Sequence, residues 1–338
     1  MTGMGEGDET IRISAAGLLV TYWCNARCAH CYELSGPRRQ GWMSADAALG
    51  HFQAMVRLGM EPAGVHLGGG EPFGDFGRLV EIVRAARQAG LAGVGYVETN
   101  GYWATDEALV RERLGALREA GMRQLSLSAD VYHQTFVDPQ CVVRLWRVAT
   151  EVLGTEGVRA RRWRFLKSPQ DLREASEAQR QAAYREALAQ HAERMTGRAA
   201  TELAPLVARQ PAEAVRGQTC VEGLRDSAHV HIDPAGYVFP GTCAGLILGR
   251  TDRGRPLDAV LAASRGPMWR ILVSEGPWGL RSLAARKGYK DDPGGYADKC
   301  HLCLSARRFL LETGAYADEL GPPELYREEW FPIGSRRP

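Results

Sequence analysis

The sequence lacks the features that mark a membrane protein or a secreted one. None of its apolar runs approaches the roughly 20 residues that a helix needs to span a bilayer. The first ten residues, MTGMGEGDET, are acidic and contain no apolar segment of the kind that signal peptides carry. We therefore expect a cytoplasmic protein with no membrane association.

The sequence also has little net charge. Its 42 basic and 40 acidic side chains leave a formal charge of +2, and the only basic run that stands out is Arg159–Lys167. Nucleic-acid binding usually requires a clear basic excess, because contacts with phosphates supply much of the affinity. We therefore expect no nucleic-acid partner. Repeats and low-complexity tracts are also lacking, and 338 residues fit one large domain or a large domain with a small one.

Cysteine, by contrast, is present at the spacing of metal ligands. With no export signal, the clustering of the eight cysteines favours metal binding in a reducing compartment over disulfide bonds. Cys24, Cys28 and Cys31 form the pattern C-x3-C-x2-C. Three thiolates are one too few to close a tetrahedral zinc site or to ligate every iron of a [4Fe–4S] cluster. A cluster held in this way keeps one iron free to bind another molecule.

Strand and helix patterns alternate through the first half of the chain. Strands are expected at 11–21, 63–67, 94–98, 124–128 and 159–166, and helices at 44–58, 75–89, 105–120 and 138–152. A long polar helical region is expected from 168 to 195. Strands that alternate with helices of this length predict βαβ units around a parallel sheet, so the fold class is α/β.

The pattern changes beyond residue 197. Val230–Ile232 and Tyr237–Phe239 are predicted to form a hairpin around the turn at 233–236. Glycine and proline become more frequent, and the remaining cysteines follow. We therefore expect a main domain at 1–215 and a smaller one at 216–338.

The first cysteine pattern and two further stretches resemble the radical S-adenosylmethionine (SAM) superfamily. Gly68–Pro72, with the sequence GGGEP, follows the second expected strand, and Glu98–Gly101, with the sequence ETNG, ends the third. In that family three cysteines hold a [4Fe–4S] cluster whose open iron chelates SAM. One electron cleaves SAM to a 5′-deoxyadenosyl radical, which takes a hydrogen atom from the substrate. The resemblance implies a partial (β/α)6 TIM-like barrel with its chemistry at the carboxyl ends of the strands.

The resemblance also implies roles in SAM binding for individual residues. His30 occupies the aromatic position of the cysteine signature and is expected near the adenine. Gly69, Gly70 and Glu71 are expected to hold the amino group of SAM. Further candidates for contacts with the ribose or a carboxylate are Asn100, Ser128, Asp130 and Arg162. The alternative for the glycines is an ordinary glycine-rich turn. For Ser128 and Asp130 it is a turn or capping role, and for Arg162 it is a solvated position on the surface.

Two residues are candidates for a catalytic role. His133 follows the fourth expected strand and is suited to binding substrate or moving a proton, with a hydrogen-bonded structural role as the alternative. Cys141 lies in the first turn of the next helix, where the helix dipole is expected to lower the pKa of its thiol. In radical SAM peptide epimerases a free thiol returns a hydrogen atom to the substrate. The simpler interpretation of Cys141 is a small buried apolar side chain.

Four more cysteines resemble the ligands of the auxiliary-cluster extensions called SPASM and twitch. They are Cys220, Cys243, Cys300 and Cys303, and the last two form C-x2-C. Four thiolates suit one auxiliary [4Fe–4S] cluster with every iron ligated, which conducts electrons or stabilises the fold. A structural zinc ion is the alternative.

Together these features predict a radical SAM oxidoreductase or maturase. The expected cofactors are SAM, its [4Fe–4S] cluster and one auxiliary [4Fe–4S] cluster, with a flavodoxin or a ferredoxin as electron donor. The expected reaction modifies a ribosomally made peptide by cross-linking, epimerisation or oxidation. Oxidation or rearrangement of a small metabolite is the second hypothesis, and a non-catalytic iron–sulfur or zinc-binding module is the third.

Overall fold

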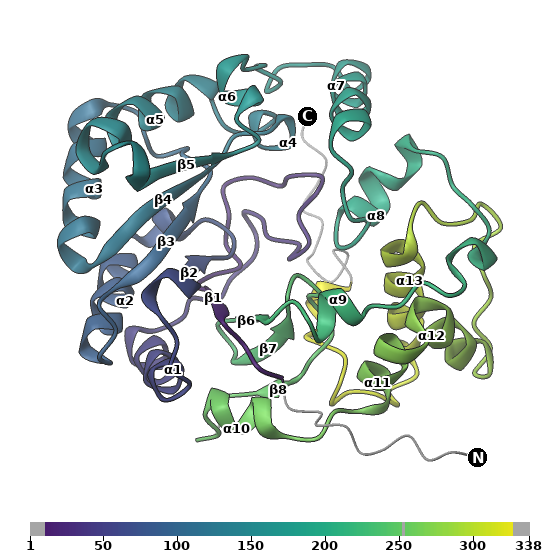
Figure 1. Ribbon diagram of the computed structural model, residues 1–338. Coiled ribbons are helices and arrows are strands. Elements are labelled where there is room, and N and C mark those ends of the chain that lie inside the picture. The colour runs from purple at the N-terminus through teal and green to yellow at the C-terminus, as the bar shows by residue number, and fades with distance from the viewer. Residues whose placement is uncertain (1–10, 252–253, 327–338) are drawn as a thin grey trace.

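One curved sheet organises the protein (Figure 1). The computed structural model describes residues 11–251 and 254–326, so the acidic stretch 1–10 lies outside the described residues. The order of the strands is β5-β4-β3-β2-β1-β6-β7-β8, and the sheet is open. The strands are β1 (Ala15–Leu19), β2 (Val65–Gly68), β3 (Val94–Thr99), β4 (Met122–Ser128), β5 (Val158–Arg161), β6 (His229–Ile232), β7 (Tyr237–Pro240) and β8 (Gly249–Arg250). The strands from β5 to β6 in this order are mutually parallel, which confirms the α/β class.

Helices cover the outer face of the parallel strands (Figure 1). They are α1 (Ala45–Arg57), α2 (Phe76–Gln88), α3 (Glu107–Ala120) and α5 (Pro139–Leu153). Each begins after a side chain that accepts a hydrogen bond from a backbone N–H of the first turn, and these capping residues are Ser44, Asp75, Asp106 and Asp138. Because such caps are local signals, the starts of these helices lie within two residues of the predicted ones.

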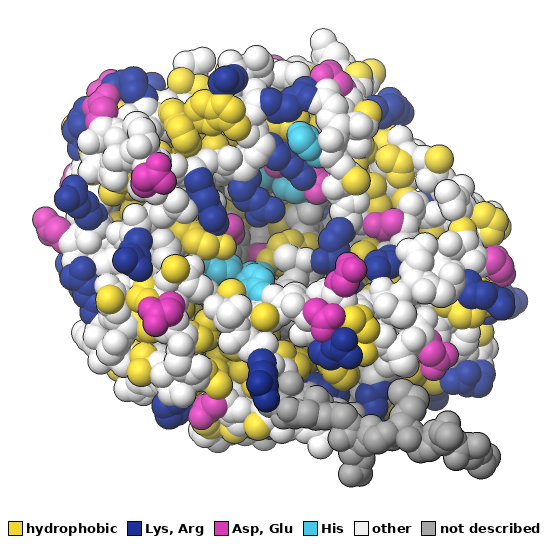
Figure 2. Space-filling view, viewed as in Figure 1, with side chains coloured by type: hydrophobic (Ala, Val, Ile, Leu, Met, Phe, Trp, Pro, Cys, Tyr) yellow, Lys and Arg dark blue, Asp and Glu magenta, His cyan; other side chains and the backbone are white. Residues whose placement is uncertain are grey.

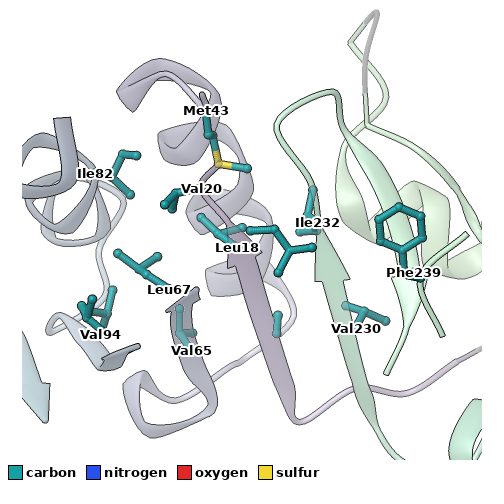
Figure 3. Packing of buried hydrophobic residues seen from close by; sticks show 14 of the residues in the cluster. Leu18, Val20, Met43, Val65, Leu67, Ile82, Val94, Val230, Ile232 and Phe239 are labelled. Carbon is teal, nitrogen blue, oxygen red and sulfur yellow. The ribbon is translucent and has the colours of Figure 1, made fainter. Parts of the chain in front are cut away.

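The main core lies between these helices and the sheet. Leu18 of β1 is in register with Leu67 of β2 and Ile232 of β6, and all three side chains are buried. Figure 3 shows these side chains together in one apolar layer. Side chains alternate between the faces of a strand, so Gly17, the residue before Leu18, faces the inside of the curved sheet.

Two predicted elements differ from the structure. The strand expected at 159–166 ends at Arg161, because Arg162 adopts a positive φ of 58° and α6 (Arg164–Lys167) begins two residues later. Arg162 and Arg164, which would share one face of the expected strand, therefore do not. The helix expected from 168 begins only at α7 (Glu177–Gln190). There a complete capping box between Ser176 and Gln179 satisfies the free N–H groups, which explains the later start.

The remaining helices belong mainly to the last third of the chain. They are α4 (Val131–Gln134), α8 (Ala199–Glu202), α9 (Val221–Leu224), α10 (Leu257–Ala262), α11 (Pro267–Ser274), α12 (Gly276–Ala285) and α13 (Lys299–Glu312). The predicted hairpin is confirmed as the antiparallel pair β6 and β7. Although β6 lies beyond residue 215, it pairs with β1 and continues the main sheet. Within the described ranges, none of the helices has the length and apolar character needed to cross a bilayer.

Candidate active site

A cavity of about 600 Å³ lies inside the curve of the sheet. Figure 2 shows a central hollow with basic, acidic and histidine side chains around it. Most of the predicted site residues line this cavity, namely Cys24, Cys28, Cys31, His30, Gly69, Gly70, Asn100, Ser128 and His133. They come from the loop after β1 and from the segments that follow β2, β3 and β4. The structure thus places them at the carboxyl ends of the parallel strands, as expected for this fold class.

The glycine stretch after β2, Gly68–Gly70, packs directly on the cysteine loop, which follows β1 and holds Cys24, Cys28 and Cys31. The N–H of Gly70 donates to the carbonyl oxygen of Thr21 over 2.7 Å, and the N–H of Glu71 donates to that of Trp23 over 2.8 Å. A Cβ atom on Gly70 would lie 2.0 Å from the carbonyl oxygen of Trp23, which is closer than any side chain can approach. Gly69 adopts a φ of 106°. These glycines allow the two segments to meet and so position the start of the cysteine loop.

Glu71, which follows the glycines, is held inside the protein. Its side chain is completely buried and does not line the cavity. One carboxylate oxygen accepts hydrogen bonds from the Thr99 hydroxyl (2.9 Å) and the Phe73 N–H (3.1 Å), and the other accepts from the Asn100 N–H (2.7 Å). Burial raises the pKa of Glu71 to about 7, although these hydrogen bonds act in the opposite direction. In this structure Glu71 therefore joins the glycine stretch to the turn after β3.

Asn100 connects that turn to the cysteine loop. Its Nδ2 donates to Oδ1 of Asn25 over 2.9 Å and lies 3.7 Å from Sγ of Cys24. Its Oδ1 accepts a hydrogen bond from the N–H of Tyr102. The side chain is thus oriented by the protein and contacts a cysteine of the loop.

A charged cluster forms a second wall of the site. Nδ1 of His133 lies 2.7 Å from Oδ1 of Asp130, and Nη1 of Arg162 lies 3.3 Å from Oδ2 of Asp130. Arg162 also pairs with Glu193. Neither Asp130 nor Arg162 lines the cavity. Asp130 contacts the lining residue His133, and Arg162 contacts Asp130.

The pKa values in this cluster reflect burial and charge together. Burial alone would raise the pKa of Asp130, but His133, His30 and Arg162 hold it well below its usual range. Burial also opposes the charge on His133, yet the neighbouring Asp130 and Cys28 raise its pKa well above the ordinary value. His30 stacks on Tyr132 at 4.7 Å, and burial lowers its pKa to about 3. The wall therefore carries a protonated His133 beside a neutral His30.

Cys141 lies apart from these residues. Its side chain, in the first turn of α5, is buried in the main core and does not line the cavity. Burial and then Asp138 raise the pKa of the thiol, so the predicted lowering by the helix dipole is wrong. The structure supports the interpretation of Cys141 as a small apolar core residue.

Gly197 and Arg198, which sequence reasoning did not assign to the site, clamp the cysteine loop. Arg198 is 2% exposed, and its Nη1 and Nη2 donate to the carbonyl oxygens of Cys28 (2.8 Å) and Ser35 (2.9 Å). Its N–H donates to the carbonyl oxygen of Cys31 over 3.0 Å. A Cβ atom on Gly197 would lie 2.5 Å from that same oxygen. The stretch Gly197–Arg198 is identifiable in the sequence, but its contact with a loop 170 residues away is not.

The other four cysteines converge on a small second cavity of about 30 Å³. Cys220, Cys243, Cys300 and Cys303 all line it. Nη2 of Arg194 donates to Sγ of Cys243 over 3.2 Å, and the buried Arg307 faces the same space. Arg194 and Thr196 line both cavities, so a single segment separates the two groups of cysteines.

Several lining residues had no role in the sequence-based prediction, namely Tyr32, Glu33, His66, Tyr96, His229 and His231. Glu98, Arg159 and Arg161 also line the cavity and come from stretches that the sequence analysis noted. Burial raises the pKa of Glu33 to about 7. The alternation His229-Val230-His231 at the start of the strand predicted at Val230–Ile232 is a signal that places two histidines on one face. The pairing of that strand with β1 is what brings them to the cavity.

Comparison with known proteins agrees with the geometry of the cysteine loop. Residues 18–152 match the family model of the radical SAM superfamily. This stretch runs from β1 to α5 and includes the loop cysteines, the glycine stretch and the turn after β3. This stretch of the chain is therefore similar to a radical SAM domain, and members of this superfamily are enzymes that use a [4Fe–4S] cluster and SAM.

Solved structures with some similarity include two that contain AdoMet, which is SAM. One is the crystal structure of BtrN in complex with AdoMet and 2-DOIA, with a TM-score of 0.40, 13% identity, and coverage of 80% of this chain and 89% of that one. The other is native anSMEcpe with bound AdoMet and Cp18Cys peptide, with a TM-score of 0.41, 13% identity, and coverage of 89% and 97%. No curated protein matches the sequence. Similarity this low does not transfer a substrate to this chain.

Proposed function

We propose that the protein is a radical SAM oxidoreductase whose first cluster is held by Cys24, Cys28 and Cys31. The observation that carries this proposal is that the three loop cysteines, the glycine stretch and Asn100 line one cavity. Among the described residues these are the only cysteines that line it, which fits a [4Fe–4S] cluster with one open iron. When bound, this cluster and SAM supply the radical that removes a hydrogen atom from the substrate.

The protein's own residues orient these groups and exclude water. Gly69 and Gly70 allow the backbone to approach SAM closely, and Asn100 holds the loop beside Cys24. Ser128 offers a hydroxyl from the end of β4. His30 presents a neutral ring that suits stacking on the adenine. His133, held by Asp130, is the candidate for binding a polar group of the substrate.

We further propose that the second cavity holds an auxiliary [4Fe–4S] cluster. Four cysteines line it, and Arg194 and Arg307 supply positive charge that offsets the charge of the thiolates. Among the described residues no three cysteine sulfurs lie within 4.8 Å of one another. A single zinc ion would bring them to about 3.8 Å, given Zn–S bonds of about 2.3 Å. The wider spacing supports a cluster, and the shared wall at Arg194 supports electron transfer between the two sites.

For the substrate we propose a ribosomally made peptide, with a small polar metabolite as the alternative. The cavity volume is typical of ligand sites, roughly 300–1,000 Å³. Its hollow opens on the face shown in Figure 2, which suits access by a peptide side chain. Its lining includes Glu33, Glu98, Arg159 and Arg161, which suits a polar group. We expect the protein to act in the cytoplasm with a flavodoxin or a ferredoxin as electron donor.

The first test is an anaerobic count of iron and sulfide, combined with electron paramagnetic resonance before and after addition of SAM. We expect about eight irons per chain in the wild type and about four in the variant Cys24→Ala/Cys28→Ala/Cys31→Ala. SAM should change the spectrum of the wild type and leave that of the variant unchanged. A wild type whose spectrum does not respond to SAM would refute the proposal. About four irons plus one zinc would refute the auxiliary cluster alone.

A further inference from the structure

Three histidines that the proposed function does not use line the same cavity. They are His66 on β2 and His229 and His231 on β6. Gly17 of β1 is in register with His66 on one side and with His231 on the other, and Ala15 is in register with His229. Because side chains alternate along a strand, the three imidazoles project from the inner face of the sheet, opposite the Leu18 layer.

The absence of a side chain at Gly17 allows the rings to meet above β1. A Cβ atom there would lie 2.4 Å from Nε2 of His66 and 2.5 Å from Cδ2 of His231. With glycine, the two Nε2 atoms lie 3.2 Å apart. Each of the three histidines offers a ring nitrogen within 4.8 Å of the other two.

The backbone fixes which nitrogen of His231 faces the others. Nδ1 of His231 lies 2.6 Å from the carbonyl oxygen of Gly241. A carbonyl oxygen can only accept, so Nδ1 carries the hydrogen and the neutral ring directs the lone pair of Nε2 toward His66. A backbone carbonyl that receives the second N–H is the usual support of a metal-binding histidine.

His229 has a ring nitrogen that no other described residue uses. Its Nε2 is buried and has no hydrogen-bond partner among residues 11–251 and 254–326. A buried polar atom without a partner is costly, which points to a ligand in this space. Burial lowers the pKa of all three histidines, and that of His231 falls to about 3, so the rings are in the neutral form that binds metals.

We propose that His66, His229 and His231 bind one divalent transition-metal ion, with a fourth position open to the cavity. An ion with tetrahedral Zn–N bonds of about 2.0–2.1 Å places its nitrogen ligands about 3.3 Å apart, close to the 3.2 Å between His66 and His231. Imidazole ligands suit zinc, copper, iron and nickel, and Co²⁺ belongs to the same series of divalent first-row metals. Three protein ligands with an open fourth position are typical of catalytic rather than structural sites.

The open position would hold a polar oxygen or nitrogen of the substrate, such as a carboxylate, a hydroxyl or an amide. Arg159 and Arg161 bring positive charge to this wall, and Glu98, which lies 3.8 Å from Arg161, offsets part of it. A second group, His30, Asp130 and His133, also has ligand atoms within 4.8 Å, but the ion pair of Asp130 with His133 already accounts for it. The three-histidine site does not depend on radical chemistry, because it shares no ligand with the cysteine loop.

The competing interpretation is a plain hydrogen bond from Nε2 of His66 to Nε2 of His231. It explains the 3.2 Å distance, but it leaves Nε2 of His229 unpartnered. The two interpretations differ in whether the protein binds a metal ion at these nitrogens.

The experiment uses the anaerobically reconstituted protein with both groups of cysteines intact and Co²⁺ as the probe. Equilibrium dialysis followed by elemental analysis gives bound cobalt and iron per chain. We expect one cobalt ion per chain. Since loss of a supporting partner alone costs 10–100-fold in affinity, loss of a ligand in His66→Gln or His231→Gln should raise the dissociation constant by at least about 100-fold. X-ray absorption at the cobalt edge should show nitrogen or oxygen neighbours and no sulfur.

The matched control is His51→Gln, which changes a buried histidine on α1 outside the cavity. It should bind cobalt as the wild type does. If His66→Gln or His231→Gln loses iron and so has not folded, His229→Gln decides the question, because His229 is the least buried of the three. The proposal would be overturned if the wild type bound no cobalt, or if the histidine variants bound cobalt as tightly as the wild type. Sulfur neighbours at the cobalt edge would also overturn it.

Discussion

Nη1 of Arg198 donates a hydrogen bond to the carbonyl oxygen of Cys28 over 2.8 Å, across 170 residues of sequence. The same guanidinium reaches Ser35 through Nη2, so one buried side chain joins the middle cysteine of the loop to the segment that follows Cys31. The planar group has donors at fixed angles and is suited to bridging two carbonyl oxygens. A loop with little regular secondary structure thus acquires a defined shape from a residue outside it.

Arg198→Lys is expected to weaken the cysteine loop. Lysine keeps the positive charge, but its single ammonium group cannot replace a fork that reaches two carbonyl oxygens. We expect a loss of stability of about 2–3 kcal/mol and a fall in iron of up to about four per chain. Denaturant unfolding and iron analysis measure these effects. Arg185→Lys on the exposed surface of α7 is the control, and an unchanged iron content in Arg198→Lys would contradict the clamp.

Gly70→Ala is expected to separate the glycine stretch from the cysteine loop. The new Cβ atom would lie 2.0 Å from the backbone oxygen of Trp23, so one of the two segments must move. We expect loss of SAM binding and of about four irons, measured by isothermal titration and elemental analysis. Gly50→Ala in α1 is the matched control, because a Cβ atom there would meet no atom of the described residues within 4 Å. It should raise stability by about 0.5–1 kcal/mol. Equal behaviour of the two variants would refute the role of Gly70.

Asp233 is expected to make stability depend on pH. Its buried carboxylate accepts from the Tyr22 hydroxyl (2.8 Å) and the Tyr237 N–H (2.8 Å), and burial raises its pKa to about 6. The folded state then binds a proton more tightly than the unfolded chain, so the free energy of unfolding falls as pH rises from about 4 through 6.

The corresponding variant is Asp233→Asn, which is neutral at every pH and keeps an oxygen acceptor for the Tyr237 N–H. Relative to this variant, the wild type should lose about 1.5 kcal/mol of stability between about pH 5 and 7.5. Urea unfolding at both pH values measures this difference. Asp46→Asn changes an exposed carboxylate and serves as the control. A difference that stays constant with pH would show that Asp233 does not titrate in this range.

Arg194→Met is expected to lower the reduction potential of the auxiliary cluster. Arg194 donates to Sγ of Cys243, and loss of a cation and a hydrogen bond at a thiolate makes reduction harder. Potentiometric titration followed by electron paramagnetic resonance measures the potential. The exposed Arg185→Met is the control. A potential that does not move would place Arg194 outside the electrostatic environment of the cluster.

Cys141→Ala is expected to leave SAM cleavage unchanged. The side chain lies in the core and does not line the cavity, so only a small apolar contact is lost, at a cost of about 1 kcal/mol. Formation of 5′-deoxyadenosine and denaturant unfolding measure the two effects. A variant that cleaves SAM but no longer returns a hydrogen atom to the substrate would restore the catalytic interpretation of Cys141.

Sequence patterns predicted the parallel strands up to β5 and the helices between them, because strand periodicity and capping residues such as Ser44 and Asp138 act over a few neighbouring residues. They missed the end of β5, where the positive φ of Arg162 accompanies its ion pairs with Asp130 and Glu193. They also misplaced the start of the long polar helix. Cys141 shows the same limit, since the burial that raises the pKa of its thiol depends on packing.

The sequence by itself determined that Cys24, Cys28 and Cys31 lie in one short loop, because the spacing C-x3-C-x2-C leaves only two or three residues between neighbouring cysteines. Only the tertiary structure decided what surrounds them. Arg198 reaches the loop through the fold, and β6 pairs with β1 so that His231 meets His66 above Gly17. Contacts of this kind join segments more than 150 residues apart. They follow from strand pairing and burial, which depend on the whole chain.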